Sequence, residues 1–131
     1  MIALDTSVLV RFLVRDDEAQ YQRARELLRR AVDRETPMFV PEVVLCELVW
    51  VLARSYRFPR SDQARTLEDL LRTDYLSFRG QDVLLRAWRA FAQGRGDFAD
   101  YLVREQALDA GCSHVATFDH GLTREAGFSR V

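Results

Sequence analysis

Apolar residues are distributed along the chain in two kinds of pattern. Short continuous apolar runs bounded by charged or turn-forming residues predict buried strands, and they occupy about 2–5, 38–40, 75–78, 114–117 and 128–131. Between these runs, apolar residues recur every three or four positions, which predicts amphipathic helices over about 6–13, 18–36, 42–55, 60–72, 83–93 and 98–110. Strands therefore alternate with pairs of helices along most of the chain.

This alternation predicts an α/β fold class with three α/β/α layers, in which helices cover both faces of a mostly parallel central sheet of four or five strands. The 131 residues, 48% of them hydrophobic, are enough for one core, so we expect a single domain over 1–131. In such sheets, ligands bind at the carboxyl ends of the strands. Asp5 and Asp119 each follow a predicted strand and are expected to share one crevice.

Four acidic residues end or interrupt the apolar runs: Asp5, Glu47, Asp100 and Asp119. An ionised carboxylate left in apolar surroundings is strongly unfavourable unless an opposite charge compensates it. Glu47 and Asp100 have only apolar sequence neighbours, so no adjacent basic residue can compensate the charge of either carboxylate. A divalent cation would compensate all four acids together, and an all-oxygen ligand set suits Mg²⁺ or Mn²⁺. The pattern therefore predicts one metal site.

The first two acids have weak structural explanations. Asp5 could simply cap the helix that follows it, but Thr6 or Ser7 could cap that helix equally well. Glu47 lies inside an apolar helix, away from the N-terminal end, and the residues four positions before and after it are valines rather than bases. Both positions therefore favour a functional role.

Asp97 and Asp100 are three positions apart, on one face of a helix and near its start. Asp97 follows a glycine and suits a capping role, so ligand and cap remain open for it, whereas Asp100 lies inside the first turn and is the better ligand candidate. Asp119 could be an ordinary turn residue. Its position after a strand, with Thr117 beside it, favours a site role through bound water.

Composition narrows the alternatives. All 19 basic residues are arginine, and the lack of lysine disfavours phosphoacceptor receiver domains and haloacid-dehalogenase-type phosphatases, which employ a lysine near their last strands. Cys46 and Cys112 lack a metal-binding spacing and are expected to be reduced cysteines in the core. No apolar stretch approaches the ~18 residues of a membrane span, and the N-terminal residues lack a basic signal-peptide segment, so we expect a cytoplasmic protein with no membrane partner.

In order along the chain, four fragments resemble the PIN-domain endoribonucleases, specifically the VapC-type toxins of bacterial toxin-antitoxin modules. They are Leu-Asp-Thr-Ser-Val-Leu-Val-Arg at 4–11, Pro-Glu-Val-Val-Leu-Cys-Glu at 41–47, Asp-Phe-Ala-Asp-Tyr-Leu-Val at 97–103 and Gly-Cys-Ser-His-Val-Ala-Thr-Phe-Asp at 111–119. The resemblance implies a PIN-like fold, Mg²⁺-dependent (or Mn²⁺-dependent) hydrolysis of RNA, inhibition by a cognate VapB-type antitoxin, and a homodimer.

The resemblance also assigns roles to individual residues. It implies that Asp5, Glu47 and Asp100 carry the metal and that Asp119 is a more variable fourth acid. Hydrolysis by water activated at the metal would need no side-chain nucleophile, and Asp119 or Asp97 would help to orient that water or a second ion.

Neighbouring residues are expected to support these acids. Thr6, Ser7 and Thr117 are expected to form hydrogen bonds behind the metal ligands, although many relatives have asparagine where this chain has Ser7. Tyr101 and Arg104 replace small residues of the family's last helix. Arg104, one turn beyond Asp100, is expected to contact RNA phosphate or the antitoxin.

Two other functions remain open at this stage. One is a PIN-like nuclease that acts on other RNA or on DNA and is not a toxin, and the other is a degenerate PIN scaffold that binds RNA or protein without catalysis. The dimer also has weak support from the apolar residues Trp50, Val51, Tyr56 and Phe58, which could equally belong to the core.

Overall fold

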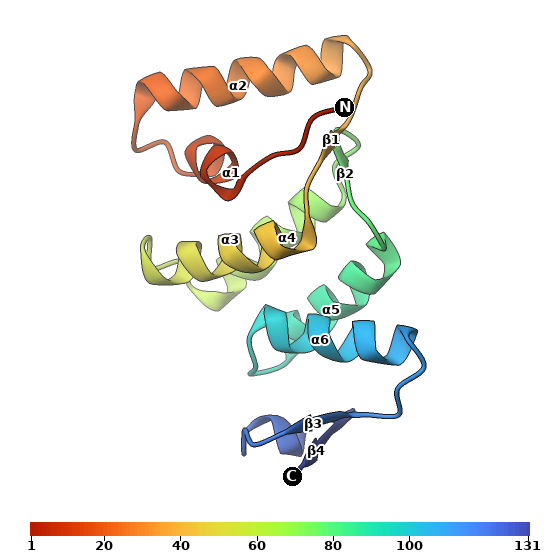
Figure 1. Ribbon diagram of the computed structural model, residues 1–131. Coiled ribbons are helices and arrows are strands. Elements are labelled where there is room, and N and C mark those ends of the chain that lie inside the picture. The colour runs from red at the N-terminus through yellow and green to blue at the C-terminus, as the bar shows by residue number, and fades with distance from the viewer. The chain divides into compact units, whose positions relative to one another are not determined.

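The computed structural model describes all residues, 1–131, and the chain forms two compact units, Met1–Arg79 and Gly80–Val131 (Figure 1). The first unit consists, in chain order, of α1 (Thr6–Leu13), α2 (Glu18–Asp33), β1 (Met38–Phe39), α3 (Glu42–Arg54), α4 (Arg60–Leu71) and β2 (Leu76–Ser77). The second consists of α5 (Gln81–Gln93), α6 (Phe98–Asp109), β3 (Val115–Thr117), the 3₁₀ turn η1 (Leu122–Arg124) and β4 (Phe128–Arg130).

The first unit contains a parallel ladder of three extended segments. β1 pairs with β2 in the register Met38 to Leu76, and Ala3 forms a parallel bridge to Phe39 on the other side of β1. The Leu4 N–H donates to the Phe39 carbonyl at 2.8 Å, which holds the N-terminal segment against β1. This ladder delivers Asp5 to the start of α1, directly after a predicted strand.

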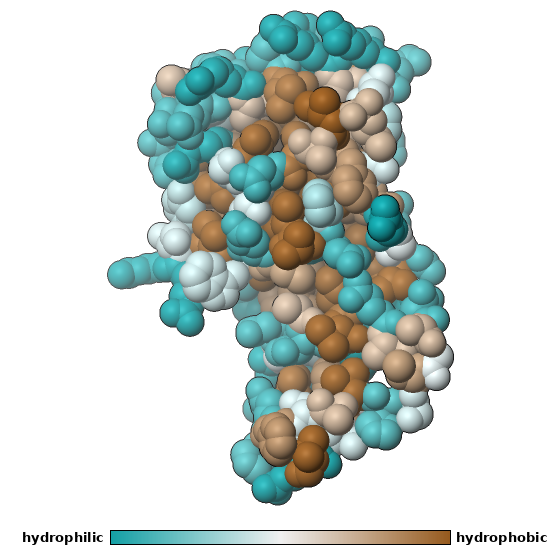
Figure 2. All heavy atoms as spheres, viewed as in Figure 1, coloured by the Kyte–Doolittle hydropathy of each residue, from teal (hydrophilic) through white to brown (hydrophobic).

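Helix α2 illustrates how local sequence sets the boundaries and the exposed face of an element. The Asp17 side chain accepts a hydrogen bond from the Gln20 N–H at 3.0 Å and so caps the first turn. On the outer face, Glu26 pairs with Arg29 at 2.7 Å and with Arg30 at 3.1 Å. Figure 2 shows this helix as a hydrophilic surface, and its apolar side faces α1, which it contacts.

The second unit is organised around the packing of α5 against α6. Phe91 of α5 meets Phe98 of α6 edge to face, with ring centroids 6.1 Å apart, and Tyr101 of α6 is also buried. β3 and β4 then pair in parallel, with Val115 opposite Phe128. The start of α6 and the loop after β3 are the two parts of this unit that carry the predicted site residues.

The α/β class expected from the pattern is confirmed, and all strand pairs are parallel. All five predicted strand segments take part in a ladder, but the strands are short and form one ladder in each unit. Every predicted helix is present, with ends within a few residues of those expected. None of the helices combines the length and the apolar character that crossing a membrane requires.

The cysteines are free, as expected, but they do not both lie in the core. Cys46 is half-buried, and burial together with the nearby Glu42 carboxylate raises the pKa of its thiol to about 11. Cys112 is exposed, so the prediction of a core position is wrong for it. It lies directly after the turn that ends α6, among exposed residues.

Replacing Leu67 by alanine should lower the free energy of unfolding by about 2–5 kcal/mol, because its side chain is buried in the first unit and its loss leaves a cavity. Arg65→Ala on the same helix is the matched control. Arg65 is exposed, so its loss should change stability by less than about 0.5 kcal/mol. Urea unfolding followed by circular dichroism measures both, and equal effects would contradict the burial assigned to Leu67.

Candidate functional site

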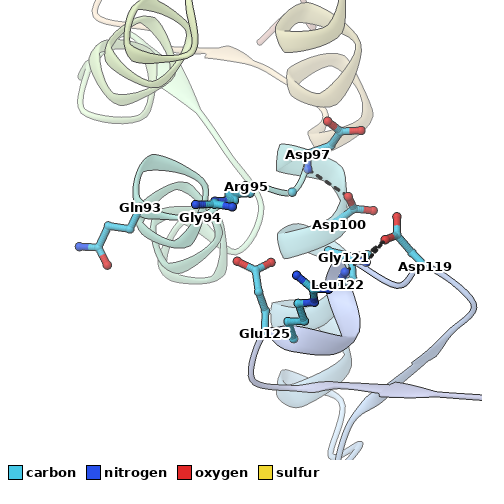
Figure 3. A pocket seen from close by; sticks show the side chains of 11 residues that line it. Gln93, Gly94, Arg95, Asp97, Asp100, Asp119, Gly121, Leu122 and Glu125 are labelled. Atoms are coloured by element: carbon cyan, nitrogen blue, oxygen red, sulfur yellow. Dashed lines mark hydrogen bonds between the residues drawn. The ribbon is translucent and has the colours of Figure 1, made fainter.

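A cleft of about 540 Å³ in the second unit gathers the acidic residues of α6 and of the loop after β3 (Figure 3). It lies between the end of α5, the start of α6 and η1. Its charged lining residues are Arg95, Asp97, Asp100, Asp119, Arg124 and Glu125. Three of the residues predicted from the sequence, Asp97, Asp100 and Asp119, are therefore brought to one cavity.

Asp100 is held by the first turn of α6. The Asp97 N–H donates to Asp100 Oδ2 at 3.0 Å, as the N-terminal residue of a helix does to an acid three positions on. The expectation that Asp100 has no capping role is therefore wrong, because its carboxylate closes the helix end that Asp97 opens. Its second oxygen, Oδ1, makes no hydrogen bond to the protein and is available to a ligand.

The electrostatic surroundings of Asp100 are unfavourable for its charge. Burial raises the pKa of this carboxyl above its usual value, the hydrogen bond from the Asp97 N–H opposes that effect, and the negative charges of Asp97, Asp119 and Glu125 raise the pKa further. Asp100 is half-buried, so solvent screens these charges only in part. A cation in the cleft would turn the same repulsion into attraction.

Asp119 is fixed by the loop that follows it. Its Oδ1 accepts hydrogen bonds from the N–H groups of Gly121 at 2.8 Å and Leu122 at 3.1 Å, which starts η1 (Figure 3). The Asp119 N–H in turn donates to Thr117 Oγ1 at 3.0 Å. Asp119 therefore has the turn role considered from the sequence. That role uses Oδ1, and Oδ2 has no hydrogen-bond partner.

Glu125 lines the same cleft and was missed by sequence reasoning. Tyr101 donates its hydroxyl to this carboxylate, with Oη 2.6 Å from Oε1 and 2.7 Å from Oε2. The Tyr101 hydroxyl also accepts a hydrogen bond from the Gly96 N–H at 2.9 Å. Glu125 follows a 3₁₀ turn and ends no apolar run, so the pattern that drew attention to the other acids could not identify it.

Asp5 occupies the N-terminal cap position of α1, but its side chain forms no capping hydrogen bond. Instead Ser7 donates its hydroxyl to Asp5 Oδ2 at 3.1 Å. The next residue, Thr6, is 3% exposed, and its Oγ1 is buried without a hydrogen-bond partner. The capping explanation for Asp5 is therefore not supported by its geometry.

Glu47 lies on an exposed face of α3. Val43 and Trp50, one turn before and one turn after it, are 67% and 57% exposed. The expectation that the predicted acids are buried among apolar residues is wrong for Asp5, Glu47 and Asp119, which are all exposed. Apolar neighbours in sequence point in other directions from the strand or helix axis and need not surround the carboxylate in space.

Arg104 is engaged within the second unit. Its guanidinium donates to Glu105 Oε2 at 3.2 Å and to the Ala126 carbonyl at 3.1 Å, and it lies 5.2 Å from the centroid of the Tyr101 ring. The side chain is only 15% exposed. The expected contact of Arg104 with RNA or an antitoxin is not supported, because this guanidinium already has internal partners.

The predicted ligands divide between the two units, with Asp5 and Glu47 in the first and Asp97, Asp100 and Asp119 in the second. In neither unit do three acidic, histidine or cysteine side chains come close enough together to hold a metal ion directly. The donors themselves fit Mg²⁺ or Mn²⁺, because the acidic side chains of the cleft offer carboxylate oxygens and its lining includes no histidine or cysteine.

Comparison with known proteins gives two matches. The family model for the PIN domain matches residues 2–127, which include all the acids discussed and run through both units. The chain is also similar to a VapC ribonuclease of Aquifex aeolicus (strain VF5). The two are 27% identical over 131 residues, which cover 100% of this chain and 96% of that protein.

Replacing Asp100 by asparagine should stabilise the metal-free protein at neutral pH. The raised pKa of Asp100 means that folding favours the protonated form of this carboxyl. The protonated carboxyl contributes fully to stability below the ordinary carboxyl range, and this contribution is lost as the pH rises through the raised pKa of the folded protein. Asparagine keeps an acceptor for the Asp97 N–H and carries no charge. The melting temperature at pH 7 should rise by about 1–3 °C, a small value because solvent screens the partly buried group.

The stabilisation by Asp100→Asn should disappear near pH 3, where the wild-type carboxyl is protonated as well. Asp74→Asn is the control, since Asp74 is exposed in the first unit and has no ion pair. Thermal melts in EDTA across this pH range measure the effect. A fall in stability at pH 7 for Asp100→Asn would contradict the repulsion inferred for the cleft.

Proposed function

The chain belongs to the PIN domain family, and from that premise we propose that it is a Mg²⁺-dependent endoribonuclease that hydrolyses RNA phosphodiester bonds. The similarity to a VapC ribonuclease over the full chain supports this activity. The structural observation that carries the proposal is the pair Asp100 and Asp119. Each has one carboxylate oxygen held by backbone N–H groups, whereas the other oxygen forms no hydrogen bond.

The arrangement of these two acids suits cation binding better than a purely structural role. A helix cap or a turn needs only one acceptor oxygen. Helix α6 uses Oδ2 of Asp100, and the loop after β3 uses Oδ1 of Asp119. The remaining oxygens lie in a cleft where other acids raise the pKa of Asp100, and they form no hydrogen bond with the protein. Preorganised acceptors that lack protein partners are what a bound cation and its water require.

We assign the cation to Asp5, Glu47 and Asp100, on the motifs that resemble the family, with Asp119 and Asp97 supporting it. These carboxylates would hold a divalent cation, which would supply positive charge to offset that of the phosphodiester and to promote ionisation of water. Ser7 would keep Asp5 in a fixed orientation through its 3.1 Å hydrogen bond. Asp119 Oδ2, free of the loop that Oδ1 anchors, would accept a proton of the attacking water.

A covalent mechanism has little support among the side chains. The pKa of Cys46 is raised to about 11, so this thiol is protonated at neutral pH and is a poor nucleophile. Ser7 donates its hydroxyl to a carboxylate, but no histidine base stands beside it. Direct attack by water therefore fits these residues best. One P–O bond would form to the water oxygen while the P–O bond to the leaving ribose oxygen breaks, so that one RNA fragment ends in a phosphate and the other in a hydroxyl group.

We further propose that the protein is the toxin of a type II toxin-antitoxin pair, with a VapB-type antitoxin as its partner and a homodimer as its working form. The similarity to a VapC ribonuclease supports this assignment. The exposed apolar side chains Val43 and Trp50, beside Glu47, support an apolar contact near a proposed metal ligand.

Asp5→Asn and Asp100→Asn should each reduce RNA cleavage at least about a hundredfold, because each removes a charged ligand of the proposed cation. Asp119→Asn should reduce the rate of RNA cleavage less, by about tenfold. Asparagine still offers an oxygen that accepts from the N–H groups of the loop, and only the charge of the second oxygen is lost. Initial rates on a fluorescently labelled RNA, measured with Mg²⁺ and again with excess EDTA, test this series. EDTA should abolish the wild-type activity.

Asp74→Asn is the control for cleavage and should retain wild-type rates, and circular dichroism should show all variants folded. Undiminished cleavage by Asp5→Asn, or activity that survives EDTA, would refute the metal-dependent mechanism. The same assay on single-stranded DNA separates an RNA nuclease from a nuclease of DNA, and absence of cleavage on every substrate would favour a binding scaffold.

Expression of the wild-type protein should arrest bacterial growth, and Asp5→Asn should not, because RNA cleavage is the proposed cause of arrest. Co-expression of the small protein encoded beside this gene should restore growth by binding the toxin. Colony counts after induction measure both effects. Normal growth with active wild-type enzyme would leave the nuclease assignment intact and overturn the toxin assignment.

A further inference from the structure

The loop that carries Asp119 also exposes an aromatic side chain. Phe118 directly precedes Asp119, between β3 and η1, and it is 79% exposed, more than any other large hydrophobic residue of the chain. Its ring takes part in neither of the two aromatic pairs of the protein, and no arginine lies over it. Water therefore surrounds most of an apolar ring, which contact with another flat apolar surface would stabilise.

The backbone around Phe118 is held in one shape by hydrogen bonds of the loop itself. Thr117 Oγ1 accepts from the Asp119 N–H at 3.0 Å. Asp119 Oδ1 accepts from the N–H groups of Gly121 and Leu122 (Figure 3), and the Leu122 side chain is buried. None of these bonds involves the ring, so the fold of the loop does not require an aromatic residue at this position. The loop nevertheless presents one, directly beside an acid of the cleft.

The same loop carries a cation without a partner in the protein. Arg124 belongs to η1 and lines the cleft together with Asp119. Although four carboxylates line this cleft, the Arg124 guanidinium forms no ion pair or hydrogen bond with any of them. Guanidinium groups bind phosphate through paired N–H donors. Within seven residues the loop therefore offers a ring, a carboxylate with one unbonded oxygen and an unpaired guanidinium.

This combination matches the chemistry of an unpaired nucleic-acid strand. Proteins bind single strands with cationic groups along the backbone and with aromatic side chains on which bases stack. Bases inside a duplex are already stacked and paired, so a side chain on a loop reaches the face of a base only where the strand is unpaired. Because the Cα atoms of adjacent residues are about 3.8 Å apart, a phosphodiester beside Asp119 brings the next base within reach of Phe118.

We propose that Phe118 is a substrate-binding residue whose ring stacks on an unpaired base next to the phosphodiester in the cleft, while Arg124 contacts a backbone phosphate. This inference rests on the proposed function and deepens it, because it makes unpaired RNA the substrate and assigns one residue to the base. Every base has a π face, so stacking positions the strand without reading its sequence.

The test is equilibrium binding of fluorescently labelled RNA, measured by anisotropy in EDTA to prevent metal-dependent cleavage. The first probe is a single-stranded RNA pool of random sequence, the second is the same pool annealed to its complement, and the third is a ribose-phosphate strand of the same length that lacks bases. The variants are Phe118→Ala, Phe118→Leu, Phe118→Trp and Arg124→Gln. Leu108→Ala is the control, because Leu108 is an apolar residue of α6 that is 45% exposed.

Phe118→Ala should raise the Kd for the single-stranded pool about tenfold, because the stacking of one base is lost, and it should leave the Kd for the strand without bases unchanged. Phe118→Trp should bind at least as tightly as wild type. Phe118→Leu should resemble alanine, since leucine is apolar but has no flat face. Wild type should bind the duplex pool more weakly than the single strands.

Arg124→Gln should act differently, because a phosphate contact does not depend on the base. It should raise the Kd for the single-stranded pool and for the strand without bases by a similar factor, about threefold, and should reduce the dependence of binding on salt. Leu108→Ala should bind every probe as wild type does. In the cleavage assay with Mg²⁺, Phe118→Ala should raise KM while kcat changes by less than about twofold.

The outcomes separate this inference from the nuclease proposal. Equal losses on the strands with and without bases in Phe118→Ala, full affinity in Phe118→Leu, or wild-type affinity in Phe118→Ala would each overturn stacking, while metal-dependent cleavage by wild type would still support the nuclease assignment. If wild type cleaves RNA but binds too weakly in EDTA, the KM values decide. If it neither binds nor cleaves RNA, the proposed function fails as well. Should Phe118→Ala not fold, the comparison of Phe118→Leu with Phe118→Trp decides.

Discussion

The arrangement of the second unit depends on one constraint: four carboxylates line a single cleft and repel one another. Such a group is stable only where the fold restrains it, and here the restraint comes from backbone N–H groups at two chain turns. The first turn of α6 holds Asp100, and the start of η1 holds Asp119. Both turns are local structures, so short-range backbone hydrogen bonds hold Asp100 and Asp119 in place, and Arg95 and Arg124 line the same cleft.

The core of the second unit supports the same cleft from behind. Tyr101 fills the space left by Gly94 and Gly96 and carries the hydrogen bond to Glu125. On the far side of the tyrosine, Arg104 stacks near the ring, and a Cβ atom at Gly127 would lie 2.6 Å from the Arg104 side chain. Two large side chains, with glycines opposite them, thus fill the space next to the cleft.

Sequence periodicity was sufficient for the elements of the fold, because the buried faces of helices such as α4 depend on spacing that can be counted directly. It also drew attention to Asp97, Asp100 and Asp119, which line one cleft in the structure. It did not identify Glu125 or the internal partners of Arg104, because their contacts come from residues 22 and 24 positions away. It also failed for the exposure of Glu47, because apolar sequence neighbours do not determine which face of a helix is covered.

Local features that lower stability coincide with the positions named by the family motifs. Asp5 stands at a helix cap without capping it, and Thr6 beside it buries a hydroxyl that has no partner. In the second unit, Asp100 is charged against three neighbouring acids. Each feature alone has a small energetic cost, and random placement would scatter such features over the chain. Their concentration at the starts of α1 and α6 is what bound cations would explain, because a cation beside either carboxylate would supply the opposite charge that the neighbouring residues do not.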